Sequence, residues 1–361
     1  MKILIVNPIM YTSETRNIKR ADTIKDTMIY DLCLGFMKLG HSVTLAAGDD
    51  YRPEKKEEYP FEVKWLDMKL KKLCVVNAIP FCPGVISLAK KGNFDLIISS
   101  EVLSLNSFML SLCASDKLIV WHELAKHLKI MRQIPSKLWY TIVARIFFRK
   151  ALIVPRSIEA KDFVSQYCKN VTEQVIDHGV NLDQFTACDE KENYFAVSAR
   201  LAPKKRIDKI INAFSLYLKK YDSTAKLCIM GDGEEEENLK DLVKSLDIEK
   251  SVVFTGRLNH SELVGKLKKA KAMLVYTEMD NNMLSIVESI AVGTPVITNT
   301  VPNNASYIRK CRLGIVDDCW NEDTLNEVAS NKSYIKNCLD YRTTLSTESK
   351  AQTFIDIYKN I

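Results

Sequence analysis

Short apolar runs alternate along the chain with longer stretches in which apolar residues recur every three or four positions. In the first half the short runs are KILIVNP, SVTLAAG, FEVKWLDM, FDLIISS, KLIVWH, ALIVPR and QVIDHG. The stretches of helical period between them include residues 22–39, 101–114, 135–150 and 157–168. Short strands separated by amphipathic helices predict a parallel sheet covered by helices on both faces.

The polar stretch NLDQFTACDEKEN, residues 181–193, interrupts this alternation, which restarts with YFAVSAR, AKLCIMGD, SVVFTGR, AMLVYTE, TPVITNT and GIVDD. We therefore expect an α/β protein with two Rossmann-like domains facing across a cleft, at residues 1–183 and 184–342. A last helix, residues 343–361, is expected to return to the N-terminal domain. Ligands of such sheets bind beyond the carboxyl ends of the strands, so the cleft is the expected site.

Composition fits this picture. The 361 residues are 47% hydrophobic and 27% charged, which favours a folded protein of two domains over a disordered chain. The ten cysteines form no CxxC pair and show no zinc-ligand spacing, so the cysteines predict no zinc site. The start MKILIVNP has no leader pattern, and we interpret the cysteines as reduced thiols of a cytoplasmic protein.

Positive charge is concentrated in the first half of the chain. Residues 61–150 hold 14 Lys and Arg against 6 Asp and Glu, interleaved with apolar runs such as KLWYTIVARIFFRK. This pattern suits a face resting on an anionic membrane or meeting a phosphorylated acceptor. It equally suits a helix packed on a sheet, with its cations reaching water.

The longest uncharged stretch, residues 73–89, contains two prolines and is too short for a membrane span. The basic segment shows no nucleic-acid recognition motif, and no nucleic acid is expected as a partner.

Cations follow the strand YFAVSAR. Arg200 ends the run, and LAPKKRIDKIINAF predicts a helix whose first turn carries Lys204, Lys205 and Arg206. Because cations oppose the helix dipole there, a bound anion would remove the conflict. The alternative is a solvated basic turn. The nearby Gly-Asp-Gly at 231–233 is interpreted as a turn before an acidic helix start.

The stretch EMDNNMLSIVESIAVGTPVITNT, residues 278–300, predicts a loop, a short helix that Gly293 ends, and a buried strand. Glu288 falls inside the apolar stripe of that helix, and a buried carboxylate needs a partner, either a ligand hydroxyl or neighbouring backbone. Eight residues of helix rise by about 12 Å, so Asp280 and Glu288 are poorly placed to flank one bond. The helix start at residues 281–284 offers free N–H groups to a phosphate.

These motifs resemble those of the retaining, nucleotide-sugar-dependent glycosyltransferases of family 4, which have the two-domain GT-B fold. DNNMLSIVESIAVGTPVIT is similar to their Glu-x7-Glu and Gly-Thr-Pro-Val pattern, and VSARLAPKKRIDKIINAF to their phosphate-binding segment. Residues 229–270 and the segment IDHGVNLDQF, where His178 stands in place of the usual Asn, also resemble the family. The first half matches more loosely: His122 falls where members often keep a histidine, but PIMYTSETRNIKR replaces the usual glycine-rich turn.

The resemblance implies roles for individual residues. Glu288 would bind the ribose hydroxyls, Arg200 and Lys205 would neutralise the leaving diphosphate, and His122 would donate to the sugar. The predicted catalytic residues are His122, Arg200 and Lys205. The predicted donor-binding residues are Asp280, Asn281, Asn282, Met283, Leu284, Glu288 and Arg257. Asp280 to Met283 replace the family's usual Glu-Gly-Phe-Gly, so the transferred sugar is expected to differ from the common cases.

The expected function is transfer of a hexosyl or N-acetylhexosaminyl group from a UDP- or GDP-sugar to a carbohydrate or polyprenyl-linked acceptor, with retention and without a metal or cofactor. The N-terminal domain would bind the acceptor and the C-terminal domain the donor. The product would belong to a surface polysaccharide or glycolipid, made in the cytoplasm or on the inner membrane face. Two alternatives remain at this point: a nucleotide-sugar epimerase of the same fold, and a degenerate protein that binds nucleotide sugars without catalysis.

Overall fold

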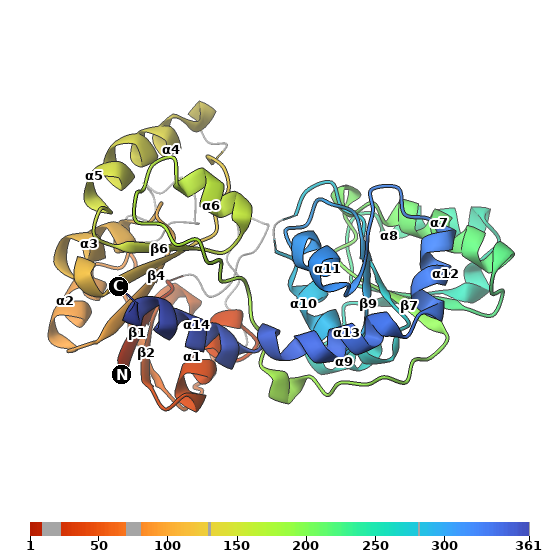
Figure 1. Cartoon of the computed structure of the whole chain (residues 1–361), viewed down its shortest axis with the longest axis horizontal. Coiled ribbons are helices and arrows are strands. Elements are labelled where there is room, and N and C mark those ends of the chain that lie inside the picture. Colours follow the sequence, from red (N-terminus) through yellow and green to blue (C-terminus); the bar gives the residue numbers. More distant parts are fainter. Residues whose placement is uncertain (9–22, 70–80, 129–130, 281, 361) are drawn as a thin grey trace. The chain divides into compact units, whose positions relative to one another are not determined.

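The computed structural model describes residues 1–8, 23–69, 81–128, 131–280 and 282–360 (Figure 1). The chain divides into two compact units, Met1–Gly179 with Thr347–Ile361 and Val180–Ser346. Each unit has its own six-stranded sheet, and all strand pairs within both sheets are parallel. The prediction of an α/β protein with two Rossmann-like sheets is therefore confirmed.

The first sheet has the order β3-β2-β1-β4-β5-β6. Its strands are β1 (Lys2–Val6), β2 (Ser42–Gly48), β3 (Glu62–Leu66), β4 (Leu96–Ser100), β5 (Leu118–His122) and β6 (Leu152–Pro155). The helices of this unit are α1 (Met28–Lys38), α2 (Gly84–Lys91), α3 (Leu105–Cys113), α4 (Ile134–Leu138), α5 (Arg145–Phe147), α6 (Ile158–Val164) and α14 (Thr347–Lys359). The strand order reverses between β1 and β4, and the carboxyl ends of such a pair form the usual ligand position of an open sheet.

Strand β1 shows why these runs are apolar throughout. Ile3 and Ile5 pack in the core on one face of the sheet, whereas Leu4 and Val6 pack in the core on the other face. Successive side chains of a strand point to opposite faces, so a sheet covered on both sides needs apolar residues at every position. The helix that follows begins later than residue 22, at Met28, where the Thr27 hydroxyl accepts a hydrogen bond from the Tyr30 N–H.

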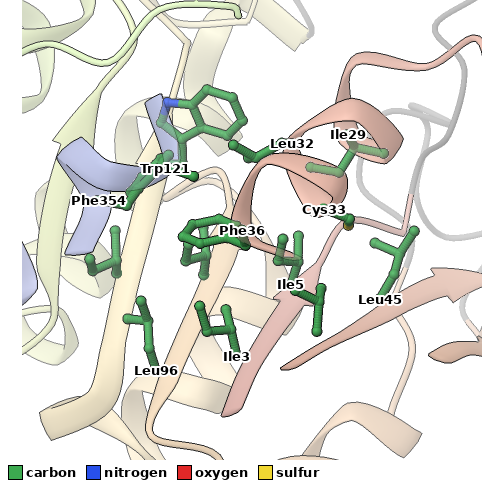
Figure 2. Packing of buried hydrophobic residues seen from close by; sticks show 14 of the residues in the cluster. Ile3, Ile5, Ile29, Leu32, Cys33, Phe36, Leu45, Leu96, Trp121 and Phe354 are labelled. Carbon is green, nitrogen blue, oxygen red and sulfur yellow. The ribbon is translucent and has the colours of Figure 1, made fainter. Parts of the chain in front are cut away.

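The C-terminal helix α14 packs against α1 in the first unit. Gly35 of α1 makes this possible, since a Cβ there would lie 2.5 Å from the backbone oxygen of Thr347. Beyond the contact, the Phe354 ring lies 6.1 Å from Phe36 and 5.4 Å from Trp121. Figure 2 shows these side chains gathered over the first sheet with the apolar residues of β1.

The second sheet has the order β12-β11-β10-β7-β8-β9, which reverses between β10 and β7. Its strands are β7 (Tyr194–Ser198), β8 (Lys226–Met230), β9 (Val252–Gly256), β10 (Met273–Leu274), β11 (Val296–Thr298) and β12 (Gly314–Val316). Its helices are α7 (Ile207–Lys220), α8 (Glu236–Ser245), α9 (His260–Lys269), α10 (Leu284–Ala291), α11 (Ala305–Cys311), α12 (Glu322–Ser330) and α13 (Ser333–Tyr341).

One expected strand does not form. Residues 174–179, QVIDHG, are irregular. The Ile176 N–H donates to the Pro155 carbonyl, and the Ile176 carbonyl accepts from the Trp121 indole, which leaves no repeating ladder for a strand. Within the described residues no helix is both long enough and apolar enough to cross a membrane. Residues 73–80 of the uncharged stretch and all of PIMYTSETRNIKR except Pro8 lie outside those residues.

Candidate functional site

The carboxyl end of β7 carries Arg200. Its side chain is exposed, and its Nη2 donates to Oε2 of Glu234 over 3.1 Å. The Gly-Asp-Gly turn fixes this segment: the Leu201 N–H donates to the Asp232 carbonyl over 2.8 Å. Gly231 has a φ of 138°, and a Cβ there would lie 1.9 Å from the Ala199 carbonyl oxygen. The glycine therefore allows the loop after β8 to pass against the loop that holds Arg200.

The basic turn after Arg200 lies ahead of the helix, which corrects the expectation that it forms the first helical turn. Lys204 and Lys205 belong to a 3₁₀ turn, Pro203–Lys205, and α7 begins only at Ile207. Arg206 takes a left-handed conformation with a φ of 41° and ends the turn. The helix starts late because this left-handed residue breaks the helical backbone in front of it.

Arg206 is committed to neighbouring carboxylates. Its guanidinium donates to both carboxylate oxygens of Asp208, and over 2.7 Å to Oε1 of Glu278. Its hydrogen bonds lower the pKa of Asp208. Arg206, Asp208 and Glu278 line a pocket of about 410 Å³, to which Glu235 adds another carboxylate. This acidic lining is unsuited to a diphosphate, so Lys205 and Arg200 are the better anion ligands of the segment.

Lys205 lies where the second sheet reverses its strand order. Its ammonium group pairs with the Asp280 carboxylate at 2.5 Å, and the two side chains are 12% and 21% exposed. The Thr277 hydroxyl donates to the same oxygen of Asp280 over 3.0 Å. Because β7 and β10 are parallel neighbours, their following loops meet at one edge of the sheet. The structure thus brings together two residues that are 75 positions apart and were both predicted to belong to the site.

The start of α10 is fixed by a neighbouring side chain. The N–H of Met283, the residue that precedes the helix, donates to the Asn304 side-chain oxygen over 2.6 Å, and Met283 is buried. Leu284, the first residue of α10, is 39% exposed, so it lies outside the buried stripe that carries Glu288. Asn282 is partly buried, whereas Asn281 lies outside the described residues. Arg257 lies exposed after β9.

Glu288 lies on the buried face of α10, as the apolar pattern predicts. Its side chain is only 6% exposed, and its Oε1 accepts a hydrogen bond from Nε2 of His260 over 3.2 Å. His260 begins α9 and packs edge-to-face on the Phe185 ring at 5.4 Å. The partner of the carboxylate is thus a histidine that the sequence interpretation missed. The only hint was its place directly after the helix cap Asn259.

The first unit holds a second carboxylate and histidine pair. His122 ends β5 and is fully buried, with its Nδ1 2.9 Å from Oε2 of Glu101. Burial alone would raise the pKa of Glu101, but His122 and the charge of Arg156 outweigh it and lower that pKa. Among the residues that the structure describes, Nε2 of His122 has no hydrogen-bond partner. The ring remains a candidate donor, stacked 6.3 Å from the Phe163 ring.

Glu101 is a second residue that the sequence interpretation missed. It follows β4 at the strand reversal of the first sheet, and its backbone has a φ of 67°. Its Oε1 accepts the N–H of Glu123 over 2.8 Å. Glutamate rarely adopts this left-handed conformation, and such backbone strain is common at functional sites. No sequence pattern signals it, because the strain follows from the packing of β4 against β5.

The remaining histidines and cysteines behave as structural groups. His127 lies within hydrogen-bond distance of the Ser136 and Tyr167 hydroxyls, and His41 of the amino terminus. The cysteines that the structure describes are free thiols. In the same residues no group of three His, Cys, Asp or Glu side chains lies close enough together to hold a metal ion.

Comparison with known proteins extends this description. Residues 181–330 match the family described as Glycosyl transferases group 1. An alpha-monoglucosyldiacylglycerol synthase of Streptococcus pneumoniae is 29% identical over 197 residues, 50% of this chain and 44% of that protein. The O-antigen chain mannosyltransferase RfbU of Salmonella typhimurium is 26% identical over 187 residues, 46% of this chain and 52% of that protein. The chain thus spans about half the length of these curated relatives.

Solved structures match over the whole chain. Anabaena Alr3699/HepE in complex with UDP is similar with a TM-score of 0.66 and 13% identity, over 100% of both chains. WaaG, a glycosyltransferase involved in lipopolysaccharide biosynthesis, is similar with a TM-score of 0.60 and 13% identity, over 99% of both chains. At such identities the likeness shows the fold. The chain therefore has the two-sheet α/β fold of GT-B glycosyltransferases, and its residues 181–330 are similar to the glycosyl transferases group 1 family.

Proposed function

We propose that this protein is a retaining glycosyltransferase of family 4 that transfers a hexosyl or N-acetylhexosaminyl group from a UDP- or GDP-sugar to an acceptor hydroxyl. The observation that carries the proposal is the pairing of Lys205 with Asp280 at the strand reversal of the group 1 domain. A cation held there by a carboxylate is ready to exchange that partner for a phosphate. Glu288, buried on the helix that follows Asp280, supplies the acceptor oxygens for ribose hydroxyls.

Each residue would act on a different part of the donor. Arg200 and Lys205 stabilise the negative charge that grows on the diphosphate as the bond to the sugar breaks. Glu288 accepts hydrogen bonds from the ribose, and Asp280 and Asn282 contact the transferred sugar. His122 donates a hydrogen bond to a sugar hydroxyl. The departing phosphate takes the proton of the acceptor hydroxyl, so the new bond forms on the face that the leaving group occupied and the configuration is retained.

The proposed acceptor is a sugar hydroxyl on a lipid-linked carbohydrate, in the synthesis of a surface polysaccharide or glycolipid. By their names, the O-antigen chain mannosyltransferase among the relatives supports a carbohydrate acceptor, and the alpha-monoglucosyldiacylglycerol synthase supports the lipid part of the acceptor. The reaction is proposed to take place in the cytoplasm at the inner membrane face, and to need neither metal nor cofactor.

A panel of UDP-, GDP- and CMP-sugars tests the donor. The matching donor should raise the melting temperature of the purified protein, because a ligand that binds only the folded state stabilises it. Lys205→Ala should weaken this shift, while Lys219→Ala, an exposed lysine at the far end of α7, should leave it unchanged. If no nucleotide sugar shifts the melting temperature, the proposal is wrong. Once the donor is known, proton NMR of the product measures whether the anomeric configuration is retained. Transfer activity in the presence of EDTA measures whether the reaction needs a metal.

A non-catalytic protein that binds nucleotide sugars is the second candidate. Asp280 favours it, since this shorter carboxylate stands where a glutamate is usual in the resembled family, next to the proposed site of the transferred sugar. The same panel separates the two functions: this candidate predicts a thermal shift without hydrolysis or transfer of the sugar over a long incubation with acceptors.

A further inference from the structure

The last part of the basic segment, residues 134–147, is a single helical stretch with one stripe of residues facing the core and one apolar stripe facing away from it. It runs from α4 through a π-helical turn, Trp139–Ala144, into α5. One stripe faces the core and repeats every four residues, with each member less than 5% exposed: Ser136, Tyr140, Ala144 and Phe148. The Trp139 indole fastens the stretch by donating to the Val102 carbonyl over 2.9 Å. The buried stripe, with the Trp139 and Phe147 rings packed on the Phe108 ring of α3, accounts for how the helix packs on its unit.

The second stripe points the other way. Ile134, Leu138, Ile142 and Ile146 have the same spacing and lie two positions away from the buried stripe, which puts them on the opposite side of the helix. Their exposed fractions are 60%, 59%, 46% and 48%. Single exposed apolar residues are common on soluble proteins, but four large aliphatic side chains in a row on one helix mark a surface that meets another apolar phase.

The charge around this stripe has one sign. From residue 124 to residue 158 the chain contains eight Lys and Arg and no Asp or Glu. Five of them lie in the helical stretch or directly beside it and are exposed: Arg132, Lys137, Arg145, Arg149 and Lys150. Aliphatic residues flanked by exposed cations are complementary to a bilayer whose surface carries anionic phospholipid, because the side chains enter the acyl region while the cations meet the headgroups.

We propose that the face formed by Ile134, Leu138, Ile142 and Ile146 with the surrounding cations is a docking surface for an anionic phospholipid membrane. The proposal rests on the membrane-linked acceptor proposed above and names the surface that would bring the enzyme to it. Binding through this face needs neither donor nor acceptor, so it can be tested apart from the transferase reaction.

Flotation of the full chain with vesicles provides the test. Phosphatidylcholine vesicles containing 30% phosphatidylglycerol should carry the protein at low salt, and vesicles of phosphatidylcholine alone should carry little of it. The double variant Leu138→Ser/Ile142→Ser and the charge variant Arg145→Glu/Arg149→Glu should each lower the ratio of bound to free protein by about tenfold or more, because each removes one of the two attractions. High salt should release the wild type, since it screens the headgroup charge.

Matched controls keep the outcomes distinct. Leu216→Ser/Val253→Ser removes two aliphatic side chains of similar exposure, 47% and 50%, from the second unit and should float like the wild type. Thermal shift with the nucleotide sugar should be unchanged in the docking variants, which shows that they are folded. Equal flotation of wild type and docking variants overturns the proposal. So does a dimer in solution that Leu138→Ser/Ile142→Ser converts to a monomer, because the stripe is then an interface between copies. Failed flotation with intact nucleotide binding overturns only the docking surface.

Discussion

Each unit has a carboxylate in contact with a histidine ring. The histidine is the more buried member of the pair in the first unit, and the carboxylate is the more buried member in the second. In the first unit His122 is completely buried, while the Glu101 side chain is 25% exposed. In the second unit the Glu288 side chain is 6% exposed, while His260 is 35% exposed. In the first unit, therefore, a partly exposed carboxylate orients a histidine ring that lies within the core. The buried Glu288 carboxylate is instead the group proposed to bind the ribose, and His260 orients it from the more exposed side.

The largest expected effect is at Glu288. Glu288→Gln keeps the shape of the side chain but removes the charge, and hydrogen bonds to charged groups contribute about 1.5–3 kcal/mol each. We therefore expect nucleotide affinity, measured by isothermal titration calorimetry, to fall about 10- to 100-fold. Glu101→Gln should change that affinity by less than about twofold if the two pairs differ in role as described. Equal losses in both variants would erase the distinction between them.

Burial of histidines in the first unit should also appear in the pH dependence of stability. His178 is packed beside Trp121, and burial together with the charge of Arg156 lowers its pKa to about 4. The unfolded chain binds this proton near pH 6.5 and the folded chain only near pH 4, so stability falls as the pH drops through that window. Between pH 7 and pH 5 the loss from this group is about 2 kcal/mol.

His178→Asn, the amide usual in the resembled family, should remove that part of the loss. Urea unfolding of both proteins at pH 7 and pH 5 gives the loss in the free energy of unfolding for each protein. The difference between the two losses isolates His178 from the other titrating groups. Glu123, Asp177 and Lys350 also act on the ring, the two acids raising its pKa and the lysine lowering it. An equal loss of stability in the two proteins would show that folding does not lower the pKa of His178.

Sequence reasoning reached the fold more fully than the site. The alternation of apolar runs and helical periods predicted both sheets, because each strand must be apolar when helices cover both faces. It also predicted that Glu288 is buried, since helical spacing alone puts it on the apolar side of α10. His260 could not be found this way, because it reaches Glu288 only through the packing of α9 against α10. The left-handed backbone of Glu101 could not be predicted for a similar reason, because it depends on the packing of two neighbouring strands.

A smaller effect is expected at His260, which acts by positioning Glu288. His260→Ala removes one hydrogen bond to the carboxylate, worth about 1 kcal/mol, and should weaken nucleotide binding about fivefold. His260→Gln keeps an N–H donor and should restore most of the affinity. The change should appear in KM for the donor and leave kcat within about twofold, because the ring does not touch the reacting atoms. A loss in kcat alone would place His260 in the chemistry instead.

The smallest effect separates the two roles of Glu101, its contact with His122 and its strained backbone. Glu101→Ala and Glu101→Gly both remove the carboxylate, but only glycine adopts a φ of 67° without a steric penalty. That penalty is about 1–2 kcal/mol, and the greater freedom of glycine in the unfolded chain offsets part of it. Glu101→Gly should therefore be more stable to urea than Glu101→Ala by about 0.5–1 kcal/mol. A more stable alanine variant would show that the backbone relaxes once the carboxylate is gone, so that the His122 contact itself holds Glu101 in the left-handed conformation.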